Sequence, residues 1–209
     1  MIKDQINNQP QILPEFSLPE HQTIKRILLF LKNVLPEFER DFQTQRPELR
    51  LEDDISEQLL YYFQAKSKEE NLLFSFNAKK GVDFKIQIAP PKLGAASIFI
   101  IEAKRFSRLH YDYVKGDTGG MERFKRECEG FGKHLSFGAM IGYVKDNAFE
   151  YWEQRINHWV DELINNSTDI EWNAEDKIIA DNNFAHYKSR HIRVSGTSIT
   201  LYHYWISLN

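Results

Sequence analysis

The sequence is poor in cysteine, proline and glycine. Its 209 residues include a single cysteine, Cys128, which excludes an intrachain disulfide framework and any zinc or iron–sulfur site built from several cysteines. The 7 prolines and 10 glycines fall below the average share, which argues against a long low-complexity linker. With 42% hydrophobic and 27% charged residues, the composition is that of a globular chain rather than of a disordered one.

Long apolar runs are missing as well. The longest are Ile27–Leu31 and Ala95–Ile101, far short of the roughly 20 apolar residues that cross a bilayer. The first residues, MIKDQINNQPQ, show neither the apolar segment nor the cleavage site of a secretory signal. We therefore expect a cytoplasmic protein without a membrane segment.

The net charge of -3 conceals an uneven distribution. Residues 103–126 carry seven Lys or Arg against three acidic residues, whereas residues 146–181 carry ten acidic residues against two basic ones. A positively charged face that meets a polyanion is consistent with this pattern, and scattered solvated charge is equally consistent with it.

The spacing of apolar residues predicts alternating helices and strands. Helices are expected from Pro19 to about Leu35, from Glu52 to Lys66, over Met121–Leu135 and over Asn147–Ile164. Acidic residues in or just before the first turn of the second helix suit the helix dipole. The expected strands are Leu72–Phe76, Val82–Ile88, Ser97–Ala103, Phe137–Val144 and Ser198–Leu208.

Charged side chains stand out on the second and third of these strands. Asp83 lies in an alternating strand, while Glu102 and Lys104 end a buried one and leave the same face of it. If the strands pair, the three side chains meet at one sheet edge. Two carboxylates with the Ala103 carbonyl would suit Mg²⁺ or Mn²⁺. Lys104 would orient or help deprotonate a water and stabilise developing charge, which suits hydrolysis of a phosphodiester.

The segments Gly81-Val82-Asp83-Phe84 and Ile100-Ile101-Glu102-Ala103-Lys104 resemble the motif of the PD-(D/E)XK nuclease superfamily, with Val82 in place of the proline. The order of predicted elements is similar too, over about residues 51–145. The resemblance implies an α/β, restriction-endonuclease-like fold with a central mixed β-sheet flanked by helices. It divides one compact domain into an N-terminal lead-in and helix (1–50), a nuclease core (51–145) and a C-terminal helix-plus-strand extension packed on that core (146–209).

The same resemblance implies a metal-dependent nuclease that acts on nucleic acid, DNA rather than RNA, in bacterial or phage defence, restriction or DNA processing. In this superfamily the first core helix often contributes a glutamate. Glu52 takes that role here, with Glu57 as the alternative, although an ordinary charged first turn explains Glu52 equally well. The implied catalytic residues are Asp83, Glu102, Lys104 and Glu52, and the implied ligands of Mg²⁺ or Mn²⁺ are Asp83, Glu102, Ala103 and Glu52.

Basic residues nearby are candidates for contacts with phosphates. Three of them lie on one predicted helix and spread around it, so not all can face one ligand, and a solvated face explains any single one. In the C-terminal segment, Ser189 and His203 could line the same cleft, where two further basic residues would share a strand face. The predicted nucleic-acid-binding residues are Arg105, Arg123, Lys125, Arg126, His191 and Arg193.

Two other functions remain open. A nuclease fold can bind nucleic acid or a protein partner without cutting, but the intact set of Asp83, Glu102 and Lys104 favours the enzyme. Hydrolysis of a small phosphate ester is less favoured, since the sequence contains no P-loop or Rossmann fingerprint. The aromatic side of Asn147–Ile164 could serve a homodimer or a partner protein, although packing on the chain's own core explains it better.

Overall fold

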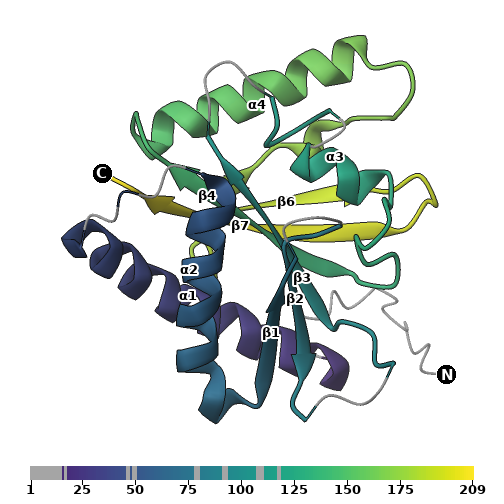
Figure 1. Ribbon diagram of the computed structural model, residues 1–209. Helices are drawn as coiled ribbons and strands as arrows, with labels where there is room; N and C mark the ends of the chain where they lie inside the picture. Colours follow the sequence, from purple (N-terminus) through teal and green to yellow (C-terminus); the bar gives the residue numbers. More distant parts are fainter. Residues whose placement is uncertain are drawn as a thin grey trace, which may run out of the picture.

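The fold is α/β, with a seven-stranded mixed sheet and helices on both of its faces (Figure 1). The computed structural model describes residues 16, 18–45, 48, 51–77, 81–90, 94–106, 111–116 and 119–209. Its helices are α1 (Pro19–Gln45), α2 (Glu52–Lys66), η1 (Ser67–Glu70), α3 (Gly120–Lys125), α4 (Phe149–Asn166) and η2 (Ala174–Asp176). Its strands are β1 (Leu72–Phe76), β2 (Phe84–Ile88), β3 (Phe99–Arg105), β4 (Phe137–Val144), β5 (Ile179–Ala180), β6 (Tyr187–Ile192) and β7 (Ser198–Ser207).

The sheet has a parallel centre and antiparallel margins. Its order is β1-β2-β3-β4-β7-β6-β5, in which β3, β4 and β7 are parallel to one another. β1 and β2 pair antiparallel at one margin, and β6 and β5 at the other. β4 is buried along its whole length, as its continuous apolar sequence predicts for a central strand. The strands fan out strongly, so that β1 and β2 cross the direction of β6 and β7 in the view of Figure 1.

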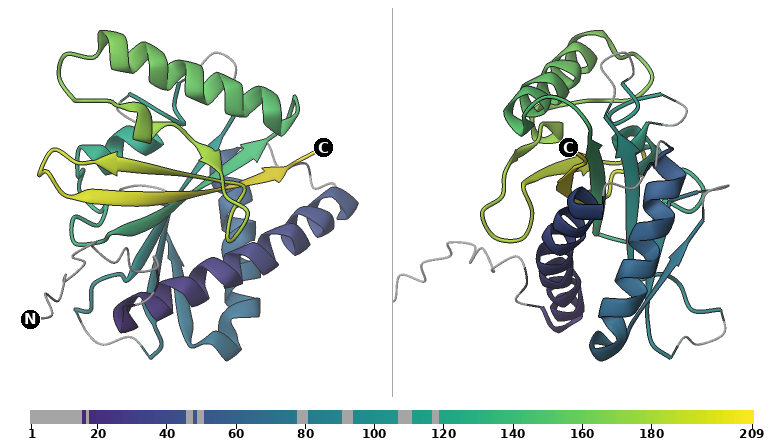
Figure 2. Two further views of the ribbon diagram at one scale, coloured as in Figure 1. Left: turned by 180° about the vertical axis from the view of Figure 1, so that it is seen from behind. Right: turned by 60° about the vertical axis from the view of Figure 1, so that its left-hand side comes forward.

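Two hydrophobic layers enclose the sheet. One layer joins α1 and α2 to alternate residues of the strands, including Ile101 and Ala103 of β3. The other joins α3 and α4 to the residues in between, including Ile100. Figure 2 shows α4 at the opposite end of the molecule from α1. Because side chains alternate along a strand, Glu102 and Lys104 belong to the side of β3 that faces α3.

Most predicted elements are present, and α2 has the bounds that the sequence predicts. α1 continues past its expected end, through Pro36 to Gln45, because the apolar face extends to buried Phe38 and Phe42. In α4, Trp152 and Trp159 pack in the layer shared with α3, which is the use of that aromatic side that the sequence favoured. No described helix is long and apolar enough to cross a membrane.

Two expectations about local structure are wrong. The helix expected over residues 121–135 ends at Lys125, and turns follow in which Glu127, Gly130 and Gly132 have positive φ. Cys128 therefore lies in a turn and not within a helix. The strand that was expected to carry both His191 and Arg193 is β6, but it ends at Ile192, so Arg193 lies beyond its end.

Candidate active site

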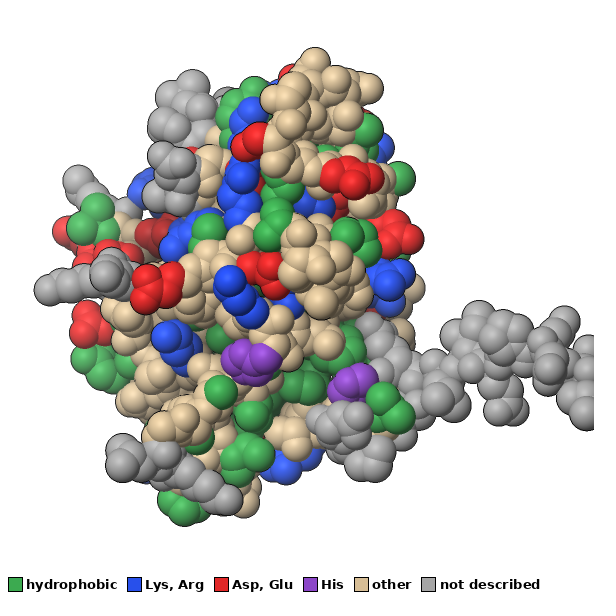
Figure 3. Space-filling view, turned by 90° about the vertical axis from the view of Figure 1, so that its right-hand side faces the viewer, with side chains coloured by type: hydrophobic (Ala, Val, Ile, Leu, Met, Phe, Trp, Pro, Cys, Tyr) green, Lys and Arg blue, Asp and Glu red, His purple; other side chains and the backbone are tan. Residues whose placement is uncertain are grey.

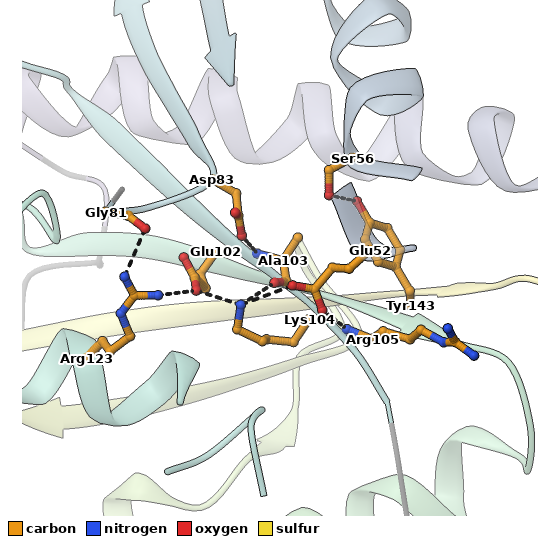
Figure 4. Close-up of polar contacts among 10 residues, drawn as sticks. All are labelled: Glu52, Ser56, Gly81, Asp83, Glu102, Ala103, Lys104, Arg105, Arg123 and Tyr143. Carbon is orange, nitrogen blue, oxygen red and sulfur yellow. Dashed lines mark hydrogen bonds and ion pairs between the residues drawn. The ribbon is translucent and has the colours of Figure 1, made fainter. Parts of the chain in front are cut away.

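Asp83 and Glu102 come together because β2 and β3 pair antiparallel. The register aligns Phe84 with Ile101, which places the residue before β2 beside the next residue of β3. The Oδ2 of Asp83 accepts a hydrogen bond of 2.7 Å from the backbone N–H of Ala103. Glu102 is fully buried. The two carboxylates thus meet as the sequence predicts, and Figure 4 shows them with the side chains that surround them.

Lys104 uses its ammonium group entirely within the site. Its Nζ lies 2.9 Å from Oε1 of Glu102 and 3.2 Å from Oε1 of Glu52, and it donates to the Ala103 carbonyl at 3.0 Å. Burial lowers the pKa of Lys104, but the negative charges of Glu102 and Glu52 outweigh burial and raise it above its usual value. Lys104 therefore donates hydrogen bonds to the two carboxylates and to the Ala103 carbonyl.

Glu52 is the first residue of α2, and its carboxylate bridges the helix to β3. Its Oε1 pairs with Lys104, and its Oε2 accepts a hydrogen bond of 2.6 Å from the backbone N–H of Arg105. Both oxygens are engaged by protein donors, so the geometry gives Glu52 a part in holding Lys104. The alternative residue, Glu57, is exposed and accepts from the hydroxyl of Tyr61, away from the site.

Arg123 reaches the site from α3. Its Nη1 lies 2.9 Å from Oε1 of Glu102, its Nη2 donates to the carbonyl of Gly81 at 3.0 Å, and its guanidinium lies over the ring of Phe131. One oxygen of Glu102 thus contacts two cations. The other oxygen, Oε2, is buried without a partner among the described residues. The Arg123 side chain is 19% exposed and that of Glu52 is 30% exposed, so a ligand could meet either of them.

The burial of the two carboxyl groups changes their protonation. Burial, followed by the charge of Glu102, raises the pKa of Asp83 to about 8. Burial also raises the pKa of Glu102, against the opposing effect of Lys104. Carboxyl groups held this close, with one oxygen unpartnered, are arranged so that a divalent cation would relieve their repulsion.

The residues present offer oxygen atoms of the kind that Mg²⁺ and Mn²⁺ prefer as ligands. The described part of the chain has no group of three or more His, Cys, Asp or Glu side chains in metal-binding geometry. The oxygens on offer are those of Asp83, Glu102 and the Ala103 carbonyl, and Mg²⁺ usually keeps several waters besides one or two carboxylates. The unpartnered Oε2 of Glu102 is the atom that carries this fit.

Three of the predicted nucleic-acid contacts are wrong, because their side chains are buried. Lys125 is inaccessible and pairs with Asp176 at 2.7 Å. His191 is equally buried, and Arg193 donates to the carbonyls of residues 132 and 133. Ser189 and His203 are likewise buried.

The remaining basic candidates reach the surface. Arg126 is about one third exposed and forms ion pairs with Glu122 and Asp169. Arg105 is half-buried. On the face shown in Figure 3, Lys and Arg side chains gather in a band across the upper half, with acidic side chains among and beside them. The surface charge is therefore mixed there. Of the six predicted contacts, Arg123 reaches the carboxylate site with its side chain, and Arg105 reaches it with its backbone N–H.

Neither a protein-family model, nor a curated protein, nor a solved structure matches this chain. The interpretation of the site consequently rests on its geometry and on the sequence motif.

Proposed function

We propose that this protein is a metal-dependent nuclease that hydrolyses phosphodiester bonds in nucleic acid, with DNA as the favoured substrate. The supporting observation is the convergence of Asp83, Glu102 and Lys104, with one buried oxygen of Glu102 unpartnered. The mixed sheet with helices on both faces is compatible with the restriction-endonuclease-like fold that the motif implies. The proposed setting is the cytoplasm, in defence, restriction or DNA processing.

The carboxylates would hold the metal. Asp83, Glu102 and the Ala103 carbonyl supply hard oxygen donors, and Mg²⁺ or Mn²⁺ bound there would supply Lewis acidity and a water of lowered pKa. Lys104 places a positive charge beside these oxygens, and this charge would stabilise the negative charge that develops on the phosphate. Glu52 holds the ammonium group of Lys104 in place through a contact of 3.2 Å.

Arg123 is the residue that we assign to the substrate phosphate. Its guanidinium is anchored to Glu102 and to the Gly81 carbonyl and remains partly exposed. A guanidinium in this position can donate to non-bridging phosphate oxygens, whose negative charge increases in the transition state. Arg123 would thus pair with the carboxylate of Glu102 before the substrate binds and with the substrate phosphate afterwards.

A cleavage assay tests the proposal. Purified protein is incubated with plasmid, single-stranded DNA and RNA, in Mg²⁺, in Mn²⁺ or in EDTA, with Asp83→Ala alongside to exclude a contaminating nuclease. We expect cleavage that requires metal and is lost in the variant. Absence of cleavage with every metal would contradict the proposal, and nucleic-acid binding retained in that case would favour the non-cleaving binding module.

A further inference from the structure

The layer between the sheet and α3 contains a continuous chain of hydrogen-bonded side chains. It lies on the same sheet face as the candidate active site, because the register aligns Glu102 with Met140 and Met140 with His203. Each of its members is less than a tenth exposed. In order, with the distances between successive polar atoms, it comprises Trp205, Tyr113 (3.2 Å), His203 (2.8 Å), Ser189 (2.7 Å), His191 (2.7 Å), Asp176 (2.5 Å) and Lys125 (2.7 Å).

The acidic end of this chain sets the direction of its hydrogen bonds. Asp176 pairs with Lys125 and can only accept, so the Nδ1 of His191 carries the proton between them. Burial lowers the pKa of His191, which keeps the ring neutral and leaves its Nε2 as an acceptor. The hydroxyl of Ser189 must therefore donate to His191.

The same reasoning determines the direction of the hydrogen bonds from Ser189 to Trp205. Since Ser189 donates to His191, its oxygen accepts from the Nε2–H of His203. Burial lowers the pKa of His203 as well, so its Nδ1 is unprotonated and accepts from the hydroxyl of Tyr113. That hydroxyl in turn accepts from the indole N–H of Trp205. Every polar atom that links the chain then has a partner, with one arrangement of protons.

The order Asp176, His191, Ser189 is that of a nucleophilic triad, but burial excludes this use. Ser189 is 3% exposed and His191 is inaccessible, so no substrate reaches the hydroxyl. The oxygen of Ser189 also receives a hydrogen bond from His203, which weakens a nucleophile. The function of this hydrogen-bonded chain is therefore inferred from the residues that its two ends contact.

Both ends of the hydrogen-bonded chain contact the helix α3. This helix has only six residues and, among the described side chains, no N-cap hydrogen bond. At its start, the backbone N–H of Met121 donates to the carbonyl of Tyr113 at 3.2 Å. At its end, Lys125 contributes its ammonium to Asp176 and its carbonyl to the N–H of Val194 at 3.0 Å.

We propose that this buried chain positions Arg123 in the candidate active site, with Lys125 and Asp176 as its principal positioning residues. Two residues apart on a helix, Arg123 and Lys125 leave α3 on nearly opposite sides, so one anchors the helix while the other reaches Glu102. The catalytic consequence rests on the proposed nuclease function, whereas the anchoring of α3 does not.

The test combines hydrogen exchange with a double-mutant cycle. In Asp176→Asn, amides of residues 121–126 should exchange about tenfold faster than in wild type. Cleavage should slow by about tenfold to a hundredfold, because a small displacement of a positioned group has a large effect on rate. In an Arg123→Gln background the same substitution should change the rate by less than about twofold, since its effect passes through Arg123.

Two further variants keep the result interpretable. The double variant Lys125→Met/Asp176→Asn removes both charges together and so leaves no unpaired buried charge if the single substitution does not fold. Tyr204→Phe is the matched control, because it removes a buried hydrogen bond, to the carbonyl of Leu28, on the opposite face of the sheet. It should change neither the exchange of α3 nor the rate of cleavage.

Each outcome is decisive. Faster exchange confined to α3 with coupled rates supports the proposal. Unchanged exchange in the Asp176 variants, or losses that add to those of Arg123→Gln, would overturn it. If the wild-type protein does not cleave nucleic acid with any metal, the proposed nuclease function is wrong, and the exchange of α3 then decides the anchoring by itself.

Discussion

Arg123 and Lys125, two residues apart on α3, bind two different buried carboxylates. Arg123 contacts Glu102 at 2.9 Å and Lys125 contacts Asp176 at 2.7 Å. A helix of six residues is too short to be stable alone, so these contacts and the backbone contacts at its ends determine where it lies. The candidate active site and the buried hydrogen-bonded chain are therefore mechanically connected through α3.

Replacing Lys104 should separate catalysis from metal binding. Under the proposed function, Lys104→Ala is expected to slow cleavage by about a hundredfold to a thousandfold, because it removes a positive charge beside the carboxylates. Mn²⁺ affinity, measured by calorimetry, should change little, whereas Asp83→Ala should lose both affinity and cleavage. Lys177→Ala serves as the control, since Lys177 pairs with Asp161 on another part of the surface. Full activity in Lys104→Ala would show that the proposed site is wrong.

Substitution of Glu52 tests whether this residue is a metal ligand or instead holds Lys104 in position. Both of its oxygens bind protein donors, so Glu52→Gln should slow cleavage while Mn²⁺ affinity stays within about threefold of wild type, less than the loss typical of a disturbed metal shell. The matched control is Glu57→Gln on the same helix, which should behave as wild type. A large loss of metal affinity in Glu52→Gln would instead identify Glu52 as a ligand.

Acid should destabilise the fold through the buried chain. Burial lowers the pKa of His191 and of His203 in the folded protein. The unfolded chain therefore binds these protons at a higher pH, near the ordinary histidine value of about 6.5. Their contribution to stability is complete above that pH and is lost as the pH falls below it toward the folded pKa.

The hydrogen bonds of Asp176 act in the same direction at lower pH. Burial alone would raise its pKa, but His191 and Lys125 lower it overall, so its contribution is lost as the pH falls through the folded pKa.

The raised pKa values of Asp83 and Glu102 act in the opposite direction, so the prediction concerns the difference between variants. Relative to wild type, the melting temperature of His203→Gln should increase as the pH is lowered from 7.5 to 5. Exposed His158→Gln should leave the slope unchanged, and a slope equal in all three proteins would contradict the assignment.

Gly119 is expected to tolerate no side chain. A Cβ added there would lie 2.1 Å from the carbonyl carbon of Lys115, a backbone atom that cannot turn away. Gly119→Ala should therefore lower the free energy of unfolding by about 1–3 kcal/mol or more, measured by urea denaturation, and should displace α3. A fully stable variant with normal cleavage would show that α3 has more freedom than its contacts suggest.

The sequence predicts the candidate active site better than it predicts the sheet around it. Asp83, Glu102 and Lys104 lie at the ends of strongly patterned strands, so their convergence follows once the strands pair. Glu52 opens a helix whose apolar spacing and acidic first turn are both clear. These are local signals, and the strands and the helix that they predict are present in the structure.

The errors have a common physical origin in long-range pairing. The local sequence around Lys125 is typical of a surface lysine. Its burial depends on the ion pair with Asp176, which lies 51 residues later in the sequence. Ser189 and His191 of β6 were expected to line a cleft, but they are buried as hydrogen-bonding partners. Gly130 and Gly132 did carry a local signal for the early end of α3, which the amphipathic pattern before them concealed.

The position of β7 has a consequence for the moment at which the candidate active site can form during synthesis. β7 is late in the chain but central in the sheet, where it pairs with β4, the neighbour of the strand that carries Glu102. A nascent chain that ends before Ser198 leaves one whole edge of β4 without hydrogen bonds and the Lys125 network without His203. Nearly all of the described chain must therefore be synthesised before Glu102 and the residues around it are held in place. Under the proposed nuclease function, a shorter nascent chain would leave nearby nucleic acid uncut.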